Sequence, residues 1–149
     1  MIDFATKKDH LEIIPVWQSG FDDNADDVAE FLAGTDGFCD RLVFREDEKI
    51  VAEMNIIRCD LSVEEKRASA VYFYALATLP EYRGRGIMSS MIRFALDKYA
   101  ADGIGYAMIE LHLKKHSVLY DKLEQMREYY PQVDFRQVKL KPLKEVWPF

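Results

Sequence analysis

The sequence predicts a single α/β domain in which helices and strands mix along one chain. Its 149 residues fit one ordinary domain, and 49% hydrophobic residues without low-complexity segments suffice for a folded core. The hydrophobic period changes from two residues in segment 68–77 to about 3.6 in segment 87–99, across a turn that contains two glycines. Strand-like and helix-like segments alternate with no repeat or linker between them. We therefore expect one domain over residues 1–149.

The first segments are a short apolar strand at residues 2–5 and a helix after it. Thr6 and Asp9 have the spacing of a capping box, with Asp in place of Glu. An apolar helical stripe follows: Leu11, Ile14, Trp17 or Gln18, and Phe21. Pro15 lies inside this stripe, so we expect it to kink or break the helix.

A second helix is predicted at residues 25–33. Asp23 or Asn24 is its expected cap, and Gly34 is its expected stop. Val28, Phe31 and Leu32 share its apolar face. Four aspartates lie around the cap: Asp22, Asp23, Asp26 and Asp27. Acidic residues at a helix start are favourable with the helix dipole, which explains the cluster without a further role.

Two strands are expected next, at residues 42–45 and 49–58, around the polar turn 46–48. A polar loop at residues 64–67 should then lead into the strand at 68–77. By the two-residue period, Glu53 shares one half-apolar face of its strand with Val51, Asn55 and Ile57.

A long helix should begin near Gly86 and end at Gly103. Its apolar face is formed by Met88, Met91, Ile92, Ala95, Leu96 and Tyr99. A strand is expected at residues 106–113, a helix capped by Ser117, and a last strand at 133–140.

The loop before the long helix has the composition of an anion site. Gly84 and Gly86 let the backbone adopt positive φ and approach a phosphate, the helix start offers free N–H groups, and Arg83 and Arg85 add charge. A simple capped turn is the alternative for this pattern alone. No lysine follows the glycines as in a P-loop, and Ser89 replaces the third glycine of a dinucleotide fingerprint.

Composition excludes several other classes of function. The net charge of −6 argues against non-specific binding of nucleic acid, and no apolar run is long enough to span a membrane. We expect a cytoplasmic protein. Cys39 and Cys59 lack metal-ligand spacing and are expected to be free buried thiols. His112 and His116 flank a strand end, so we expect no metal site.

Residues 76–88 closely resemble the acetyl-coenzyme A signature of the GNAT N-acetyltransferase superfamily. The core of that signature is Arg/Gln-x-x-Gly-x-Gly/Ala, and Glu81 stands at its first position. The resemblance implies the GNAT fold, a central mixed and mostly antiparallel sheet flanked by helices, in the order β-α-α-β-β-β-α-β-α-β. It also implies that acetyl-CoA is bound. The pantetheine arm would lie along Leu76, Ala77 and Thr78, and the pyrophosphate on the amides of Arg83, Gly84, Arg85, Gly86, Ile87 and Met88.

The resemblance further implies an N-acetyltransferase that moves an acetyl group from acetyl-CoA directly to a primary amine. Residues 119–124 match the segment that carries the family's usual acid, a tyrosine, which places Tyr120 in that role. A tyrosine hydroxyl with a reference pKa of about 10 is protonated at neutral pH and can donate to the departing thiolate. The alternative is that Tyr120 only packs in its helix.

The base is assigned by elimination among carboxylates. Where some members of the family carry a glutamate, this chain has Ala70. Glu53 is our first candidate and Glu110 the second, because a half-buried carboxylate can have a raised pKa. Tyr72 and Tyr74 share a strand face and would order a water relay.

The expected acceptor is a small-molecule or peptide amine. In the family, the loop between the first two helices borders the acceptor site, so the four aspartates there would attract a cationic amine. One clear late strand stands where the family has a hairpin. A homodimer could complete the sheet, Trp147 and Phe149 could cover its edge, or the domain is curtailed. The alternative function is a catalytically weak or inactive GNAT-like module that binds CoA or a protein partner.

Overall fold

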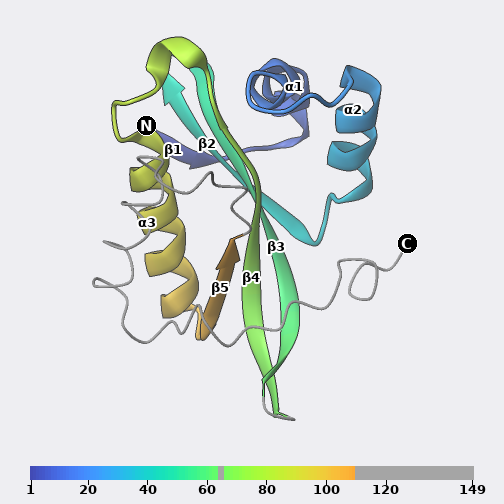
Figure 1. Cartoon of the computed structure of the whole chain (residues 1–149), viewed down its shortest axis with the longest axis vertical. Coiled ribbons are helices and arrows are strands. Elements are labelled where there is room, and N and C mark those ends of the chain that lie inside the picture. The colour runs from blue at the N-terminus through green and yellow to red at the C-terminus, as the bar shows by residue number, and fades with distance from the viewer. Residues whose placement is uncertain (64–65, 110–149) are drawn as a thin grey trace.

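The computed structural model of the protein describes residues 1–63 and 66–109 (Figure 1). The strands are β1 (Ile2–Phe4), β2 (Cys39–Glu46), β3 (Lys49–Val63), β4 (Lys66–Thr78) and β5 (Tyr106–Ile109). The helices are α1 (His10–Gln18), α2 (Ala25–Gly34) and α3 (Ile87–Ala101), with short 3-10 turns η1 (Lys7–Asp9) and η2 (Pro80–Tyr82). This order agrees with the first eight elements that the sequence predicts. The helix and strand expected after β5 lie outside the described residues.

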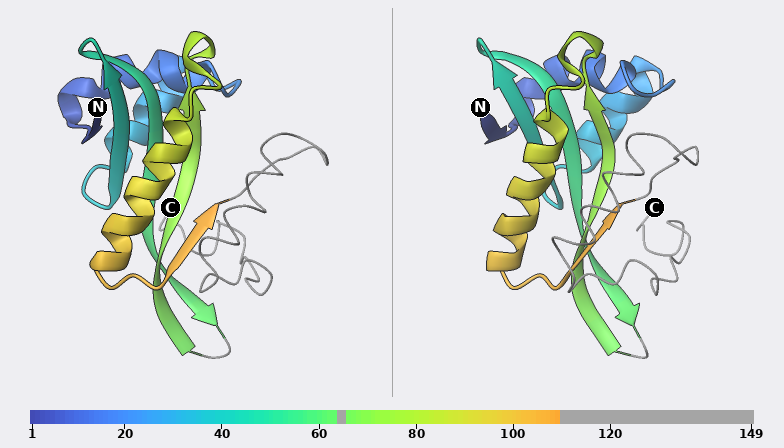
Figure 2. Two further views of the ribbon diagram at one scale, coloured as in Figure 1. Left: turned by 90° about the vertical axis from the view of Figure 1, so that its left-hand side faces the viewer. Right: turned by 60° about the vertical axis from the view of Figure 1, so that its left-hand side comes forward.

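The five strands form one sheet whose spatial order, β1-β2-β3-β4-β5, is also their order along the chain. Neighbouring strands from β1 to β4 are antiparallel, and β5 is parallel to β4. The sheet is therefore mixed and mostly antiparallel, as the sequence predicts. Helices α1 and α2 cover one face, while α3 crosses the other, as Figures 1 and 2 show.

Two predicted helix caps form hydrogen bonds between a side chain and the backbone. The Thr6 N–H donates to Asp9 Oδ2 at 2.7 Å, which is half of a capping box, and the Asp27 N–H donates to Asn24 Oδ1 at 2.8 Å. Of the kink or break predicted at Pro15, the break was wrong, because α1 continues through this residue. Proline removes the hydrogen bond to the Leu11 carbonyl, but Leu11 lies on the exposed side of α1, where water can take that place.

The β3–β4 hairpin is longer than predicted. Lys66 and Arg67 belong to β4 and pair with Val63 and Ser62, so the predicted polar loop at 64–67 was wrong at these two positions. Charged residues are compatible with strand structure here because this end of β4 is exposed. Cys39, the first residue of β2, pairs with Ile57 of β3, and the β3–β4 hairpin continues beyond that pair.

The sheet has a separate hydrophobic core on each face. The α3 face packs strand residues against the predicted apolar stripe of the helix, including the fully buried Met91, Ala95 and Tyr99. The opposite face packs β2, β3 and β4 against α1 and α2, with Trp17 and Leu32 at its centre. Both faces of the strands are thus covered, and the central strands are buried on both sides.

Strand β4 contains a bulge near its end. Asn55 of β3 pairs with Tyr74, whereas Glu53 pairs with Ala77, so two residues of β4 oppose one of β3. Ala75, in the bulge, has a left-handed φ of +50°, which is uncommon for a residue with a side chain. The bulge turns Tyr74 and Ala75 toward the same core, under α1 and α2. Backbone strain of this kind gathers near functional sites.

Candidate active site at the glycine loop

The glycine loop joins the end of β4 to the start of α3. Gly84 and Gly86 have φ values of +74° and +75°, and Gly86 is the cap residue directly before Ile87. No described atom lies within 4 Å of the place where a Cβ would stand on either glycine. Backbone conformation, and not packing, therefore requires glycine, and the space beside the loop is open. The first N–H groups of α3 have no partner inside the helix, which is the arrangement that binds phosphate.

The two arginines of the loop contact protein groups on opposite sides. Arg83 donates from Nε to the Thr78 carbonyl at 2.8 Å and from Nη2 to the Ser19 carbonyl at 2.7 Å. Arg85 donates from both Nη atoms to the Glu46 carboxylate, at 3.1 and 2.7 Å, which lowers the Glu46 pKa. The sequence pattern gave no signal for these partners, because they are distant along the chain. Both guanidinium groups are exposed and bound to protein groups, and the Arg83 backbone N–H donates to the Pro80 carbonyl at 3.2 Å.

The end of β4 lies beside this loop, and within the described residues its far edge has no strand next to residues 76–78. On one side Ala77 and Thr78 pair with Glu53 and Ala52 of β3. On the other side β5 pairs with residues 70–73, and within residues 1–63 and 66–109 no strand pairs with that side of residues 76–78. Figure 2 shows β5 diverging from β4 at this point. Leu76, Ala77 and Thr78 therefore lie on a strand edge that can bind a ligand with amide groups.

Glu53 lies next to Ala77 and is fully buried, on the sheet face under α1 and α2. The Asn55 side-chain N–H donates to Glu53 Oε2 at 3.0 Å, while Oε1 has no partner among the described residues. Burial raises the pKa of Glu53 well above its ordinary value, against the smaller effects of the Arg41 charge and the Asn55 hydrogen bond. The sequence indicated a half-apolar setting, and the structure encloses the carboxyl completely.

Glu53 belongs to a buried polar group that sequence reasoning missed. Arg41 pairs with Asn55 across the strands and is almost fully buried. Its guanidinium donates to Asp36 at 2.8 Å and to the Leu32 carbonyl at 2.6 Å. An arginine directly before the apolar run 42–44 is the signal that could have revealed this network, because buried arginines require partners.

Aromatic rings surround the same face. The Trp17 ring lies 5.7 Å from the Tyr74 ring and 5.2 Å from the Phe31 ring, and Tyr72 lies 6.0 Å from Tyr74. Trp17 Nε1 also donates to Asp23 Oδ2 at 2.7 Å, which ties the acidic loop between α1 and α2 to the core. Asp23 thus has a structural partner, and Asn24 is the cap. Tyr120 and Glu110 lie outside the described residues.

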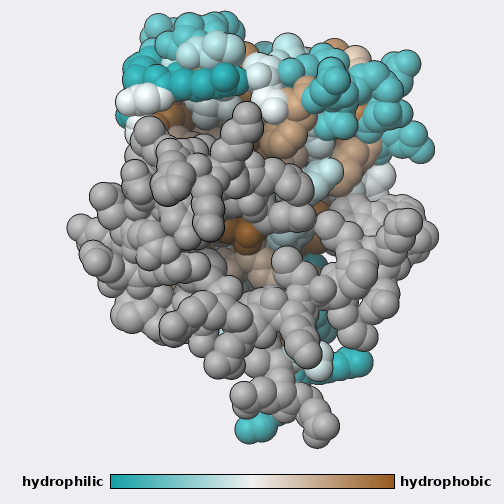
Figure 3. Space-filling view, in the orientation of Figure 1, coloured by the Kyte–Doolittle hydropathy of each residue, from teal (hydrophilic) through white to brown (hydrophobic). Residues whose placement is uncertain are grey.

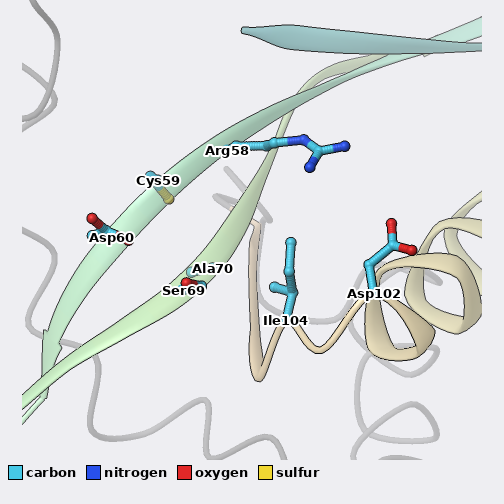
Figure 4. A pocket seen from close by; sticks show the side chains of 7 residues that line it. All are labelled: Arg58, Cys59, Asp60, Ser69, Ala70, Asp102 and Ile104. Atoms are coloured by element: carbon cyan, nitrogen blue, oxygen red, sulfur yellow. The ribbon is translucent and has the colours of Figure 1, made fainter.

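A cavity of about 360 Å³ lies at the opposite end of α3 from the glycine loop (Figure 4). It is lined by Arg58, Cys59, Asp60, Ser69, Ala70, Asp102 and Ile104. Arg58 is held by a salt bridge to Asp40 at 3.1 Å and lies over the Tyr99 ring. This cavity is therefore on the α3 side of the sheet, away from Glu53.

The cysteines are free, as predicted, although Cys59 is only half-buried. Burial raises the pKa of Cys39 to about 11, so it is a neutral thiol near pH 7. No three His, Cys, Asp or Glu side chains gather into a possible metal site within residues 1–63 and 66–109. Among the same residues there is no helix with the length and hydrophobicity that a membrane crossing needs.

The surface near the loop is divided by polarity. Figure 3 shows hydrophilic residues over the η2 loop and over α2, with hydrophobic side chains visible between them. The exposed residues on α2 include Asp26, Asp27 and Glu30, so this helix contributes negative charge.

Solved structures with this fold include several acetyltransferases. The aminoglycoside antibiotic 6′-N-acetyltransferase from Acinetobacter haemolyticus is 12% identical with a TM-score of 0.69, over 95% of this chain and 94% of that chain. The ribosomal-protein-alanine N-acetyltransferase from Brucella melitensis biovar Abortus is 22% identical with a TM-score of 0.66, over 85% and 89%. A predicted acetyltransferase from Clostridium acetobutylicum, solved with acetyl-CoA, is 17% identical with a TM-score of 0.66, over 97% and 98%. At these identities the likeness shows the fold.

The family is shown by the sequence itself. No curated protein sequence gave a match. A family profile described as "Acetyltransferase (GNAT) domain" matches residues 1–110, which include the glycine loop and all five described strands. Since that match covers most of the chain, and the fold agrees with it, the protein belongs to the GNAT family of acetyltransferases.

Proposed function

We propose that this enzyme transfers the acetyl group of acetyl-CoA directly to a primary amine. The observation that carries the proposal is the junction of the glycine loop with the end of β4, where no strand among the described residues pairs with the far side of residues 76–78. An open strand edge suits the amide groups of a pantetheine arm, and a helix start with positive-φ glycines suits a pyrophosphate. Leu76, Ala77 and Thr78 would bind the arm. The amides of residues 84–88 would bind the pyrophosphate, because the expected Arg83 amide instead donates to the Pro80 carbonyl.

Acetyl-CoA supplies an acetyl group activated as a thioester. The amine nitrogen attacks the carbonyl carbon, a C–N bond forms and the C–S bond breaks; the amine loses a proton to a base, and the leaving thiolate gains one from an acid. We assign the acid to Tyr120. We keep Glu53 as the base on its raised pKa and its place beside Ala77. Because its carboxyl is buried, Glu53 would act through water ordered by Tyr72 and Tyr74, not by contact with the amine.

The acceptor is proposed to be a cationic small-molecule or peptide amine. Asp22 in the loop between α1 and α2 and Asp26 in the first turn of α2 are exposed, close in sequence to the structurally engaged Asp23. Negative charge at this rim would raise the local concentration of a cationic substrate. The similar structures include enzymes whose names specify an aminoglycoside and a ribosomal protein alanine, so both kinds of amine belong in a test panel.

The test of the donor site is calorimetric titration with acetyl-CoA. We expect the wild-type protein to bind and Gly86→Glu to lose binding by at least about 100-fold, because a side chain is strained at φ +75° and its charge repels phosphate. Gly103→Glu is the matched control. Gly103 has φ +83° and an equally open Cβ position, but it lies at the other end of α3. Equal loss of binding in both variants would mean that strain alone is responsible.

Thiol release against a panel of amines then tests the transfer. Tyr120→Phe should lower kcat by about 100-fold with acetyl-CoA binding retained, as expected for loss of a general acid. Binding of acetyl-CoA without turnover of any amine would favour the CoA-binding module. Absence of binding by the wild-type protein would refute the donor site.

A further inference from the structure

Arg83 joins two parts of the molecule that the sequence separates by 64 residues. Its Nη2 donates to the carbonyl of Ser19, the residue that follows α1, and its Nε donates to the carbonyl of Thr78, the last residue of β4. A planar guanidinium can span two carbonyls in this way, whereas an ammonium group is a single point of donation. The side chain thus connects the end of α1 to the end of β4.

The end of α1 is suited to receive this cation. The last four carbonyls of a helix lack internal partners and carry partial negative charge. No basic residue lies in the last turn of α1, so Arg83 supplies the charge that a local lysine or arginine would otherwise provide. The approach is also close in space, since a Cβ on Gly20 would stand 3.3 Å from the Cβ of Ala77.

Arg85 provides the contrast within the same loop. Its guanidinium extends to Glu46, at the turn between β2 and β3, and makes no contact with α1. Both arginines are exposed and carry the same charge, two residues apart. They differ in their hydrogen-bond partners: Arg83 binds the end of α1, and Arg85 binds the end of β2.

We propose that Arg83 is a positioning residue that fixes the loop at residues 19–24 to the donor strand, and so sets the distance between the acceptor amine and the thioester. This rests on the proposed function, in which residues 76–78 bind the pantetheine arm and the loop at 19–24 borders the acceptor. The backbone N–H of Arg83 donates to the Pro80 carbonyl at 3.2 Å, and its side chain would align the two substrates. A misplacement of about 1 Å between reacting groups is enough to slow transfer strongly.

The experiment compares Arg83→Met, Arg83→Lys and Arg85→Met. Hydrogen exchange of the ligand-free protein is followed by mass spectrometry in peptides that cover residues 19–24 and 46–48. We expect Arg83→Met to accelerate exchange in the first peptide by about tenfold, the factor for loss of one charge-assisted hydrogen bond. Arg83→Lys should behave in the same way, because it keeps the charge but not the fork. Arg85→Met should affect only the second peptide.

Kinetics at saturating acetyl-CoA supply the second readout. Arg83→Met should raise the KM of the amine by about tenfold and more than Arg85→Met does, while the calorimetric Kd of acetyl-CoA changes less. Unchanged exchange in residues 19–24, or equal increases of the acetyl-CoA Kd in Arg83→Met and Arg85→Met, would overturn the proposal. If the wild-type protein fails to bind acetyl-CoA, the proposed function fails, and the exchange comparison still decides whether Arg83 holds the loop.

Discussion

The two faces of the sheet differ in what they bury. Under α3 the core is built from apolar side chains such as Met54, Phe73 and Met91, apart from the hydroxyl of Tyr99. Under α1 and α2 the interior also contains the four buried polar or charged residues of the described chain: Thr35, Arg41, Glu53 and Asn55. Glu53, Asn55 and Arg41 each have one polar atom without a partner among residues 1–63 and 66–109.

Buried polar atoms without partners lower stability, so a face that retains them is not optimised for stability alone. The α3 face supports the helix whose start forms the glycine loop. The other face lies beside the bulge of β4 and the loop at residues 19–24. One face thus holds the glycine loop in place, while the other combines packing with buried polar groups.

The largest expected effect is on the apolar face. Met91 is fully buried against the sheet, so Met91→Ala should leave a cavity and lower the free energy of unfolding by about 2–5 kcal/mol. Chemical denaturation measures the loss. Phe94→Ala on the same helix is the control, because Phe94 is 40% exposed and should cost less. A similar loss in both variants would show that the α3 core does not depend on this packing.

Asn55→Leu should destabilise the polar face by about 1–3 kcal/mol, because Glu53 Oε2 loses its donor inside the protein. The double variant Glu53→Leu with Asn55→Leu should recover most of that loss, since both polar partners are then removed together. Denaturation of the two single variants and the double variant gives the coupling energy. Additive losses of stability would mean that the two side chains contribute independently. The polar face would then lack the coupling between polar partners that distinguishes it from the apolar face.

At acid pH, Glu53→Gln is expected to change the free energy of unfolding least among these variants. Its effect should grow as the pH rises. The pKa of Glu53 is raised in the folded state, so its stabilising contribution is full below the unfolded pKa, about 4.3, and declines as pH rises toward the folded pKa. The decline is at most about 1.4 kcal/mol per pH unit. Glutamine keeps the acceptor for Asn55 and cannot ionise, so the variant should become increasingly more stable than the wild type above pH 5.

Thermal unfolding from pH 4 to 8 measures this difference, with Glu30→Gln on the exposed side of α2 as the control. If Glu53 is the base, kcat should fall while stability rises. A variant that is less stable than the wild type at pH 8 would show that the carboxyl is structural.

Local signals in the sequence predicted the parts of the fold that depend on local contacts. The start of α3 at Gly86, the cap at Asn24 and the stop at Gly103 each require only neighbouring residues, and the structure has all three. The break predicted at Pro15 is absent because the cost of proline depends on whether the freed carbonyl can reach water. The bulge at Ala75 has no sequence signal, since glycine is the residue that positive φ normally selects.

The candidate site was predictable in its backbone and not in its side chains. The glycine loop was placed from its motif, and its positive φ values agree with the expected geometry. Arg83 and Arg85 were expected at phosphate, whereas their observed partners, Ser19 and Glu46, are distant in sequence and become neighbours only through the fold. The same holds for Glu53, whose complete burial depends on α1, β2 and β4 together.

The order of the sheet, in which spatial neighbours are also neighbours along the chain, has a consequence for folding kinetics. The β2–β3–β4 meander needs only short loops to close, so it can form early at little cost in chain entropy. Strands β4 and β5 are parallel, and α3 connects them along the chain. They can therefore pair only after α3 has folded back onto the sheet. Slow steps in refolding should therefore report on α3 and β5, and the glycine loop would acquire its final shape in that late phase.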